Sequence, residues 1–446
     1  MKRALPIAEG PAKRRLPLAE NVRPIDEATR PIYAVWEFTL RCDLACIHCG
    51  SRAFRARPDE LTTAEAISLV EQMAALGVRE VSLIGGEAYL RSDWLDVVRA
   101  IRANGMVASL TTGGFGLDAE LAQSAARAGL VAASVSVDGL SAMHDAVRGV
   151  VGSFDAAMRA LSALADAGLR ITANTQLYRQ NLPTLEELFE ILLARKIRGW
   201  QLQVTVAMGR AADQDGLLIE PYQMLELMPI VARIKRRADE AKVLLWPGNN
   251  VGYFGPYERI LRGNQPGGHS SGCGAGRTTL GVESNGDIKG CPSLPTREYV
   301  GGNIREHSLR DIWQRAEALR FTRERTTDEL WGYCKGCYYA ETCKAGCSWT
   351  AHSLFGKRGN NPYCHHRALE LLARGERERV VRAGLAPGEP FDHGSFDLVL
   401  EAWPQDELEQ AREVAKSGAG FLLQSPSLTP PSLAEPKRRA PGHEPS

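Results

Sequence analysis

The ten cysteines of this 446-residue chain fall into two groups, and their spacing constrains the fold more than any other feature. Cys42, Cys46 and Cys49 share one short segment, and no further cysteine occurs before Cys273. The other seven lie between Cys273 and Cys364. Because a reducing compartment keeps thiols free of disulfides, thiols that cluster in this way indicate metal ligands. We therefore expect two metal-binding regions, separated by a scaffold that needs no cysteine.

The composition is that of a globular enzyme with about two or three domains. The chain is 44% hydrophobic and 24% charged, with a net charge of +1. A balance this close to neutral gives no reason to expect nucleic acid or a membrane surface as a partner. No apolar run approaches the ~20 residues of a membrane span, and the basic N-terminus lacks the apolar core of a signal peptide. The expected location is the cytoplasm.

The first cysteine group has the spacing C-x3-C-x2-C. Three thiolates can hold a four-iron cluster and leave one iron open to a ligand that is not protein. A structural zinc site would normally close itself with a fourth protein ligand. His48 lies inside the motif, but its neighbour Cys49 already points from the same turn. We therefore place His48 outside the ligand set, in a supporting or packing role.

This segment resembles the cluster motif of the radical S-adenosylmethionine (radical SAM) superfamily. The resemblance includes the aromatic-rich run YAVWEFT before the cysteines and Thr39 within it. A second match is VSLIGGEAYL, which contains Gly85, Gly86 and Glu87. The resemblance implies that Gly85, Gly86 and Glu87 contact the amino group of the methionyl moiety of S-adenosylmethionine. Glycine permits close approach of the backbone, and a carboxylate suits an ammonium group.

Between the two cysteine groups, short apolar runs alternate with amphipathic helical stretches. This alternation predicts a parallel sheet with outer helices. Six strand–helix units are too few for a closed eight-stranded barrel, and they fit the partial (β/α)6 barrel of the resembled superfamily. In such folds the chemistry lies at the carboxyl ends of the strands. The predicted strands are Tyr33–Phe38, Glu80–Ile84, Val107–Thr111, Ala132–Val137, Arg170–Gln176 and Gly199–Val204.

Four further segments resemble superfamily loops: TTGG (residues 111–114), SVSVDG with MHDAVRG (residues 134–149), the strand that carries Asn174, and MGRA (residues 208–211). Cofactor-binding candidates here are Ser136, Arg148 and Asn174. The resemblance implies that Arg148 pairs with the methionyl carboxylate, since a guanidinium binds carboxylates in a bidentate manner. An ordinary turn at Asp138 and a surface ion pair of Arg148 are the structural alternatives. No role for MGRA follows from the sequence.

The seven later cysteines resemble the SPASM extension found on many radical SAM enzymes. Zinc ribbons are the alternative, but seven ligands do not divide into tetrahedral sets. The SPASM resemblance implies two auxiliary [4Fe–4S] clusters. The first would be held by Cys273, Cys291 and Cys347. The second would be held by Cys334, Cys337, Cys343 and Cys364.

Two clusters bound entirely by thiolates need one more ligand than these cysteines provide. Some relatives carry an extra cysteine soon after the first position, where this chain has GAGRTTLGVE. We hypothesise that the first auxiliary cluster has a ligand other than cysteine, or an open iron that binds substrate. His269 is a candidate ligand, with a solvent-exposed loop position as its alternative.

The expected organisation follows the chain. Residues 1–30 and the tail 423–446 are expected to be disordered. The partial barrel covers 31–215, a helical linker 216–268, the SPASM domain 269–366 and a C-terminal helical extension 367–422. Within the SPASM domain, GVESNGDIKGC predicts a β-hairpin with an Asn-Gly turn. Residues 306–325 predict one bridging helix, and the extension is expected to begin with a helix over about 365–384.

The resemblance supplies the expected mechanism. The cluster at Cys42, Cys46 and Cys49 would pass one electron to S-adenosylmethionine and generate a 5′-deoxyadenosyl radical, which abstracts hydrogen from the substrate. SPASM enzymes often act on ribosomally made peptides, so the expected activity is oxidative modification of a peptide. The expected partners are a flavodoxin or ferredoxin as electron donor and a separate peptide-recognition protein. The alternatives are a tetrapyrrole or other small-molecule substrate, and a non-catalytic zinc scaffold. The sequence identifies no catalytic acid or base.

Overall fold

The computed structural model describes residues 18–265, 267–270, 272–383 and 394–417. Its centre is a ten-stranded sheet with the strand order β10-β9-β8-β1-β2-β3-β4-β5-β6-β7. Strands β8 and β1 to β7 are parallel, whereas β9 and β10 run antiparallel to their neighbours. The first six strands are β1 (Tyr33–Thr39), β2 (Glu80–Gly85), β3 (Val107–Thr112), β4 (Ala132–Ser136), β5 (Arg170–Leu177) and β6 (Gly199–Val204). The six predicted strands are therefore confirmed.

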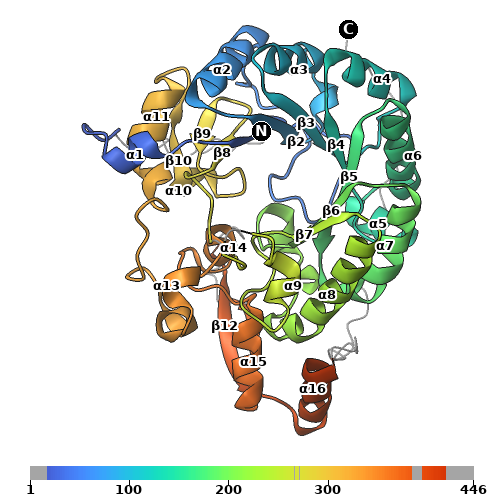
Figure 1. Ribbon diagram of the computed structural model, residues 1–446, viewed down its shortest axis with the longest axis vertical. Helices are drawn as coiled ribbons and strands as arrows, with labels where there is room; N and C mark the ends of the chain where they lie inside the picture. The colour runs from blue at the N-terminus through green and yellow to red at the C-terminus, as the bar shows by residue number, and fades with distance from the viewer. Residues whose placement is uncertain (1–17, 266, 271, 384–393, 418–446) are drawn as a thin grey trace, which may run out of the picture.

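Helices cover the outer face of this sheet and enclose its core (Figure 1). Their ends follow local capping chemistry. At α2, the Thr62 side chain accepts from the backbone N–H of Glu65, and Gly77 ends the helix with φ 101°, the left-handed conformation that glycine adopts readily. The outer helices are α2 (Thr63–Leu76), α3 (Trp94–Ala103), α4 (Ala119–Ala128), α5 (Ser141–Arg148), α6 (Ser153–Asp166) and α7 (Leu185–Ala194).

The segment predicted as a helical linker, 216–268, contributes a strand to the sheet. Helices α8 (Met224–Glu240) and α9 (Glu258–Arg262) flank strand β7 (Leu244–Pro247), which pairs in parallel with β6. Leu245 and Pro247 are buried while Leu244 and Trp246 are exposed. This alternation over only four residues is too short a signal beside the long helix that precedes it.

The seven-cysteine region is joined to the barrel through the same sheet. Strands β8 (Thr279–Val282) and β9 (Asp287–Lys289) form the predicted hairpin, and β8 pairs in parallel with β1. The loop is longer than an Asn-Gly turn, because Glu283 and Asp287 pair around the three residues between them. Gly286 closes this loop with φ 88°, as in a three-residue hairpin. Strand β10 (Val300–Asn303) follows on β9.

The single helix predicted over 306–325 is instead two helices, α11 (Leu309–Arg315) and α12 (Glu317–Arg320). The chain bends because Arg320 and Arg323 turn inward to the buried carboxylate of Asp26, at 3.1 Å and 2.7 Å. Their guanidinium groups also donate to the carbonyls of Gln314 and Trp313 at the end of α11.

Asp26 lies in helix α1 (Pro24–Ala28), within the segment predicted to be disordered. That prediction is wrong for this helix, since the buried ion pairs of Asp26 dock it on the SPASM region. The rest of the N-terminal prediction, over residues 1–17, lies outside the described residues, as does the predicted tail.

The C-terminal extension is partly helical. Helix α15 (His365–Ala373) ends before Gly375, whose φ is 72°. The following ERERVVR run forms strand β11 (Glu376–Arg382), paired antiparallel with β12 (Phe396–Ala402). The helix expected over about 365–384 is therefore wrong after Ala373, because Gly375 turns the chain away in a left-handed conformation and the run that follows pairs with β12. The remaining helices are α10 (Thr296–Tyr299), α13 (Ala340–Cys343), α14 (Ser348–Phe355) and α16 (Gln405–Ser417). No helix in the described part of the chain has the length and apolar character needed to cross a membrane.

Candidate functional site

Cys42, Cys46 and Cys49 lie in the loop that follows strand β1, at the carboxyl edge of the sheet. Cys46 is buried, and the other two are half-buried. The thiols accept from nearby donors: Leu44 N–H to Cys42 Sγ at 3.4 Å and Ala53 N–H to Cys49 Sγ at 3.4 Å. Burial raises the pKa of the Cys42 thiol to about 12 and also raises that of Cys46. An anionic sulfur in this loop therefore needs a positively charged partner such as iron.

The MGRA segment, for which no role followed from the sequence, holds the cysteine loop in place. Arg210 Nε donates to the carbonyl of Cys46 at 2.7 Å, and the Arg210 N–H donates to the carbonyl of Cys49 at 2.9 Å. Gly209 has φ 60°, and a Cβ at this position would lie 2.5 Å from the Cys49 carbonyl oxygen. Only glycine fits this approach without displacing the loop. The segment is therefore a brace for the cysteine loop.

Gly85 and Gly86 pack against the backbone that leads into the cysteine loop. A Cβ on Gly85 would lie 2.2 Å from the Thr39 carbonyl oxygen, and one on Gly86 would lie 2.0 Å from that of Arg41. Gly85 also lines the cavity described below, whereas Gly86 is not among the described lining residues. From the sequence, both glycines were predicted to let the backbone approach a ligand closely. The structure adds that they allow β2 to lie against the start of the cysteine loop.

Glu87 is 2% exposed and turned into the protein. Its carboxylate accepts from the Thr112 hydroxyl and, at 2.6 Å, from the Gly113 N–H. Burial raises the pKa of Glu87 to about 8. It is not among the described residues that line the cavity, and one of its oxygens lies within 4.8 Å of Cys42 Sγ and an Asp43 oxygen. Its predicted contact with the methionyl amino group stays a prediction.

Arg148 forms a buried ion pair rather than the surface pair considered from the sequence. Its Nη2 lies 2.6 Å from Asp138 Oδ2, and Nη1 lies 3.7 Å from Cys46 Sγ. His48 Nε2 lies 3.2 Å from the same Asp138 oxygen. Burial alone raises the pKa of Asp138, but Arg148 and His48 outweigh it and lower the pKa overall. His48 thus has a supporting role, and the guanidinium that would meet a carboxylate ligand already has one carboxylate partner.

A cavity of about 450 Å³ opens beside these groups, and we call it the outer cavity. Cys49, Gly85, Ser136, Arg148 and Asn174 all line it. The volume lies within the range of small-molecule and cofactor sites. The structure therefore brings most of the predicted S-adenosylmethionine residues to one space next to the cysteine loop.

The first auxiliary set, Cys273, Cys291 and Cys347, lines a second cavity of about 710 Å³, which we call the inner cavity. Ser136, Asn174 and Trp349 line both cavities. Burial raises the pKa of Cys347 to about 12, and the neighbouring Cys273 and Cys291 add to the effect. The three cysteines that the sequence assigned to one cluster are therefore neighbours, and they face the cavity.

His269, the candidate fourth ligand, is turned elsewhere. Its Nδ1 lies 2.9 Å from the carbonyl oxygen of Ser270, and its ring packs on Phe254. It is not among the described residues that line the inner cavity. The described lining residues of the inner cavity include no carboxylate and no imidazole. None of these side chains therefore offers a fourth ligand of either type to the first auxiliary set.

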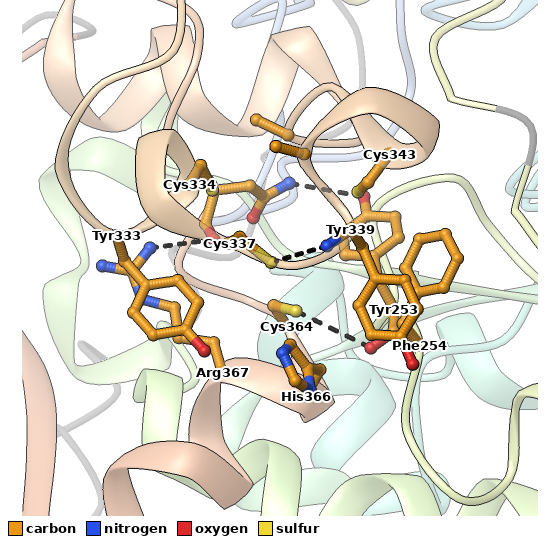
Figure 2. Close-up of a pocket in the computed structure, with 13 residues that line it drawn as sticks. Tyr253, Phe254, Tyr333, Cys334, Cys337, Tyr339, Cys343, Cys364, His366 and Arg367 are labelled. Atoms are coloured by element: carbon orange, nitrogen blue, oxygen red, sulfur yellow. Dashed lines mark hydrogen bonds between the residues drawn. The ribbon is translucent and has the colours of Figure 1, made fainter. Parts of the chain in front are cut away.

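The second auxiliary set, Cys334, Cys337, Cys343 and Cys364, surrounds a small space of about 20 Å³ (Figure 2). Burial raises the pKa of Cys343 to about 12. Aromatic rings pack below the thiols: Phe254 stacks on Tyr339 at 4.4 Å, and Tyr339 meets the His366 ring edge-on at 5.0 Å. This four-thiol set has the ligand number of a closed cluster and lies apart from both cavities.

Tyr253, which the sequence did not single out, connects the two auxiliary sets. Its hydroxyl accepts from the Cys347 N–H at 3.1 Å, and its carbonyl accepts from the Cys364 thiol at 3.6 Å. It is fully buried, and a Cβ on Gly346 would lie 2.4 Å from its ring. No sequence motif distinguishes a single tyrosine in a linker, so only the tertiary structure shows that Tyr253 contacts both auxiliary sets.

Comparisons with known proteins agree with this arrangement. The radical SAM superfamily matches residues 36–209, and the SPASM iron–sulfur cluster-binding domain matches residues 273–338. An AdoMet-dependent heme synthase of Methanosarcina barkeri is 30% identical over 76% of this chain and 97% of its own. The mycofactocin maturase MftC of Mycolicibacterium smegmatis is 31% identical over 71% of this chain and 78% of its own.

Among solved structures, Streptococcus suis SuiB bound to its precursor peptide SuiA has a TM-score of 0.59 and 19% identity, over 75% of each chain. This likeness concerns the fold. The SPASM match ends at residue 338, so Cys343, Cys347 and Cys364 lie beyond it. In the structure, Cys343 and Cys364 line the same small space as Cys334 and Cys337, and Cys347 lines the inner cavity with Cys273 and Cys291.

The donor set also fits the cofactors, because thiols in groups of three and four are the usual ligands of iron–sulfur clusters and the outer cavity has room for a small cofactor. The non-catalytic zinc scaffold has no support beside relatives that are synthases and maturases. This chain belongs to the radical SAM superfamily, in its SPASM branch, and is an S-adenosylmethionine-dependent enzyme that carries [4Fe–4S] clusters.

Proposed function

We propose that this enzyme oxidatively modifies side chains of a ribosomally synthesised peptide. The relative MftC is a maturase, and SuiB shares the fold in a structure with a bound precursor peptide. The proposed modification is a crosslink or a related oxidation, because auxiliary clusters suit a reaction that returns an electron to the protein. The cluster and S-adenosylmethionine, when bound, supply the radical that removes hydrogen from the substrate.

The residues have distinct proposed roles. Cys42, Cys46 and Cys49 hold the cluster that meets S-adenosylmethionine, and the outer cavity holds that cofactor against Ser136 and Asn174. Arg148 keeps positive charge beside the Cys46 thiolate and is itself fixed by Asp138. The four cysteines of the second auxiliary set hold a closed cluster, and the first set holds one that faces substrate.

One observation carries this proposal: the outer and inner cavities share part of their lining, which includes Ser136, Asn174 and Trp349. A substrate in the inner cavity would therefore lie between the S-adenosylmethionine site and the first auxiliary set. This arrangement suits hydrogen abstraction on one side and electron removal on the other.

Two partners belong to the proposal as well. A flavodoxin or ferredoxin would supply the electron for the first step. A separate recognition protein would present the peptide.

The test is mass spectrometry of short peptides encoded beside the gene, co-expressed anaerobically with the enzyme. The expected result is a product that has lost hydrogen, formed only when Cys42, Cys46 and Cys49 are intact. If every such peptide stays unchanged while S-adenosylmethionine is consumed, the peptide proposal fails.

Tetrapyrrole modification is the second candidate, because a heme synthase is similar over 97% of its length. The same anaerobic assay with an iron-containing porphyrin that carries propionate side chains would detect loss of carbon dioxide. That product, without a peptide product, would favour the tetrapyrrole.

A further inference from the structure

The inner cavity differs from the outer cavity in charge. None of the described residues that line the inner cavity has a charged side chain. The outer cavity has Glu37, Arg57, Glu283 and Lys289 in its wall. These four pair with one another, at 2.9 Å for Arg57–Glu37, 3.2 Å for Arg57–Glu283 and 2.7 Å for Lys289–Glu283. Their charges are thus satisfied beside the cavities rather than inside the inner one.

Amide side chains take the place of charges on one wall of the inner cavity. Asn174 and Gln176 of β5 are paired in register with Gln201 and Gln203 of β6, the adjacent strand (Figure 1). All four line the inner cavity, as expected for alternate residues on one face of a sheet. Only one bond joins them among the described contacts, a long 3.4 Å contact from Gln176 Nε2 to Gln203 Oε1. These amides are therefore available to a ligand.

The chemistry of this wall selects the ligand. Each amide side chain offers both donors and an acceptor, which matches the N–H and C=O of a peptide backbone. Trp246 lies next to Gln201 in the sheet register, and Trp349 of α14 also lines the cavity. Their rings favour an aromatic or aliphatic side chain. A carboxylate entering the cavity would lose its water and find no cation, which is costly.

We propose that the inner cavity binds an uncharged peptide segment, with backbone amides paired to the four-amide wall and an uncharged aromatic or aliphatic side chain against the tryptophans. This inference rests on the proposed peptide function and specifies its substrate. It disfavours tetrapyrroles, because their propionate carboxylates have no partner in this cavity. Gln201 and Trp246 line only the inner cavity, so they report on substrate rather than on S-adenosylmethionine.

The experiment uses the anaerobically reconstituted enzyme with S-adenosylmethionine in equilibrium dialysis. One probe is a pool of short peptides with capped ends and randomised central positions, and the other is coproporphyrin. The retained peptides are sequenced by mass spectrometry. Retained sequences should be depleted in Asp and Glu by about tenfold relative to the input pool, and coproporphyrin should not be retained.

The informative variant is Gln201→Glu, which keeps the shape and adds a negative charge. It should shift the retained pool toward Lys and Arg, an effect that a merely structural role would not produce. The matched control is Gln123→Glu on the exposed face of α4, which should leave both the retained pool and 5′-deoxyadenosine formation unchanged.

The outcomes separate the two proposals. Retention of peptides with no charge preference, or the same preference in Gln201→Glu, would overturn the inference while the peptide function stands. Retention of coproporphyrin with no peptide would overturn the peptide function itself.

Discussion

The cysteine loop of the barrel and the second auxiliary set both hold clustered, largely half-buried cysteines, yet they are stabilised differently. The barrel loop contacts a buried ion pair, Arg148 with Asp138, to which His48 also lies close, and a large cavity opens beside it. The second auxiliary set has a small central space and is packed by the rings of Phe254 and Tyr339. The difference indicates a reaction site in the first region and an enclosed redox site in the second.

One feature is common to both regions: a buried arginine with a carboxylate partner. Arg148 pairs with Asp138, and Arg367 pairs with Glu378 at 2.5 Å. Arg367 also lies over the Tyr333 ring at 4.9 Å. Both regions thus have an arginine near their cysteines. They differ in that the barrel loop borders a large cavity, whereas aromatic rings pack around the second auxiliary set.

The largest expected effect comes from removing the thiols. Changing Cys42, Cys46 and Cys49 together to Ala should abolish 5′-deoxyadenosine formation and leave the auxiliary iron in place. Changing Cys337 and Cys343 to Ala should remove the iron of the second set, while the enzyme still forms 5′-deoxyadenosine. Iron content and chromatographic detection of 5′-deoxyadenosine measure both. Formation of 5′-deoxyadenosine by the barrel triple variant would refute the assignment of that site.

The next effect concerns the buried ion pairs. Arg148→Met leaves the Asp138 carboxylate, which is 0% exposed, without its main counter-charge. We expect the free energy of unfolding to fall by about 3–5 kcal/mol. Arg367→Met should lower it by a similar amount, because it leaves Glu378 without its arginine partner. Arg233→Met, in the exposed pair with Glu186, should cost under about 1 kcal/mol. Urea denaturation measures all three. Equal losses in all three would show that burial does not set these energies.

The third prediction uses pH. His144 accepts the Asp138 N–H at 3.0 Å, and burial lowers the pKa of His144 from 6.5 to about 4. Between these values the unfolded chain binds a proton that the folded chain does not, so stability falls as pH falls from 6.5 to 4. The loss from this histidine is about 3 kcal/mol.

The variant His144→Asn keeps an acceptor and removes the titration, so it should lose less stability over the same range. The difference between wild type and variant isolates His144 from His365, whose pKa burial also lowers to about 4. His307→Asn, at an exposed position, serves as the control. An unchanged pH profile in His144→Asn would contradict the expectation.

The smallest expected effect compares two loop glycines. Gly209→Ala meets the Cys49 carbonyl oxygen and requires φ 60°, so we expect a loss of about 2 kcal/mol. Gly336→Ala, beside Cys337, meets nothing within 4 Å and should change stability by less than about 0.5 kcal/mol. Thermal unfolding measures both. A larger loss in Gly336→Ala would reverse the contrast.

The local patterns predicted the elements well where periodicity extended over many residues. Strands β1 to β6 were predictable because each is an apolar or alternating run in a chain where such runs alternate with helical stretches. The bend between α11 and α12 was not, because its cause is Asp26, far away in the chain. Strand β7, which has four residues, and strand β11, which is mostly charged, were missed for a related reason: each is defined by pairing with another strand, β6 and β12, rather than by its own apolar pattern.

The candidate site divides in the same way. The sequence by itself separated Cys42, Cys46 and Cys49 from the seven later cysteines, because that spacing is a local property of the chain. The division of the seven into two sets came from the resemblance to the SPASM extension. The sequence also indicated the residues at strand ends, because parallel strands bring those ends to one edge. Only the tertiary structure decided that Arg148 pairs with Asp138, that Gly209 braces the cysteine loop, and that Tyr253 joins the auxiliary sets. These contacts join residues far apart in sequence, and burial and charge neutralisation, which no local pattern encodes, select them.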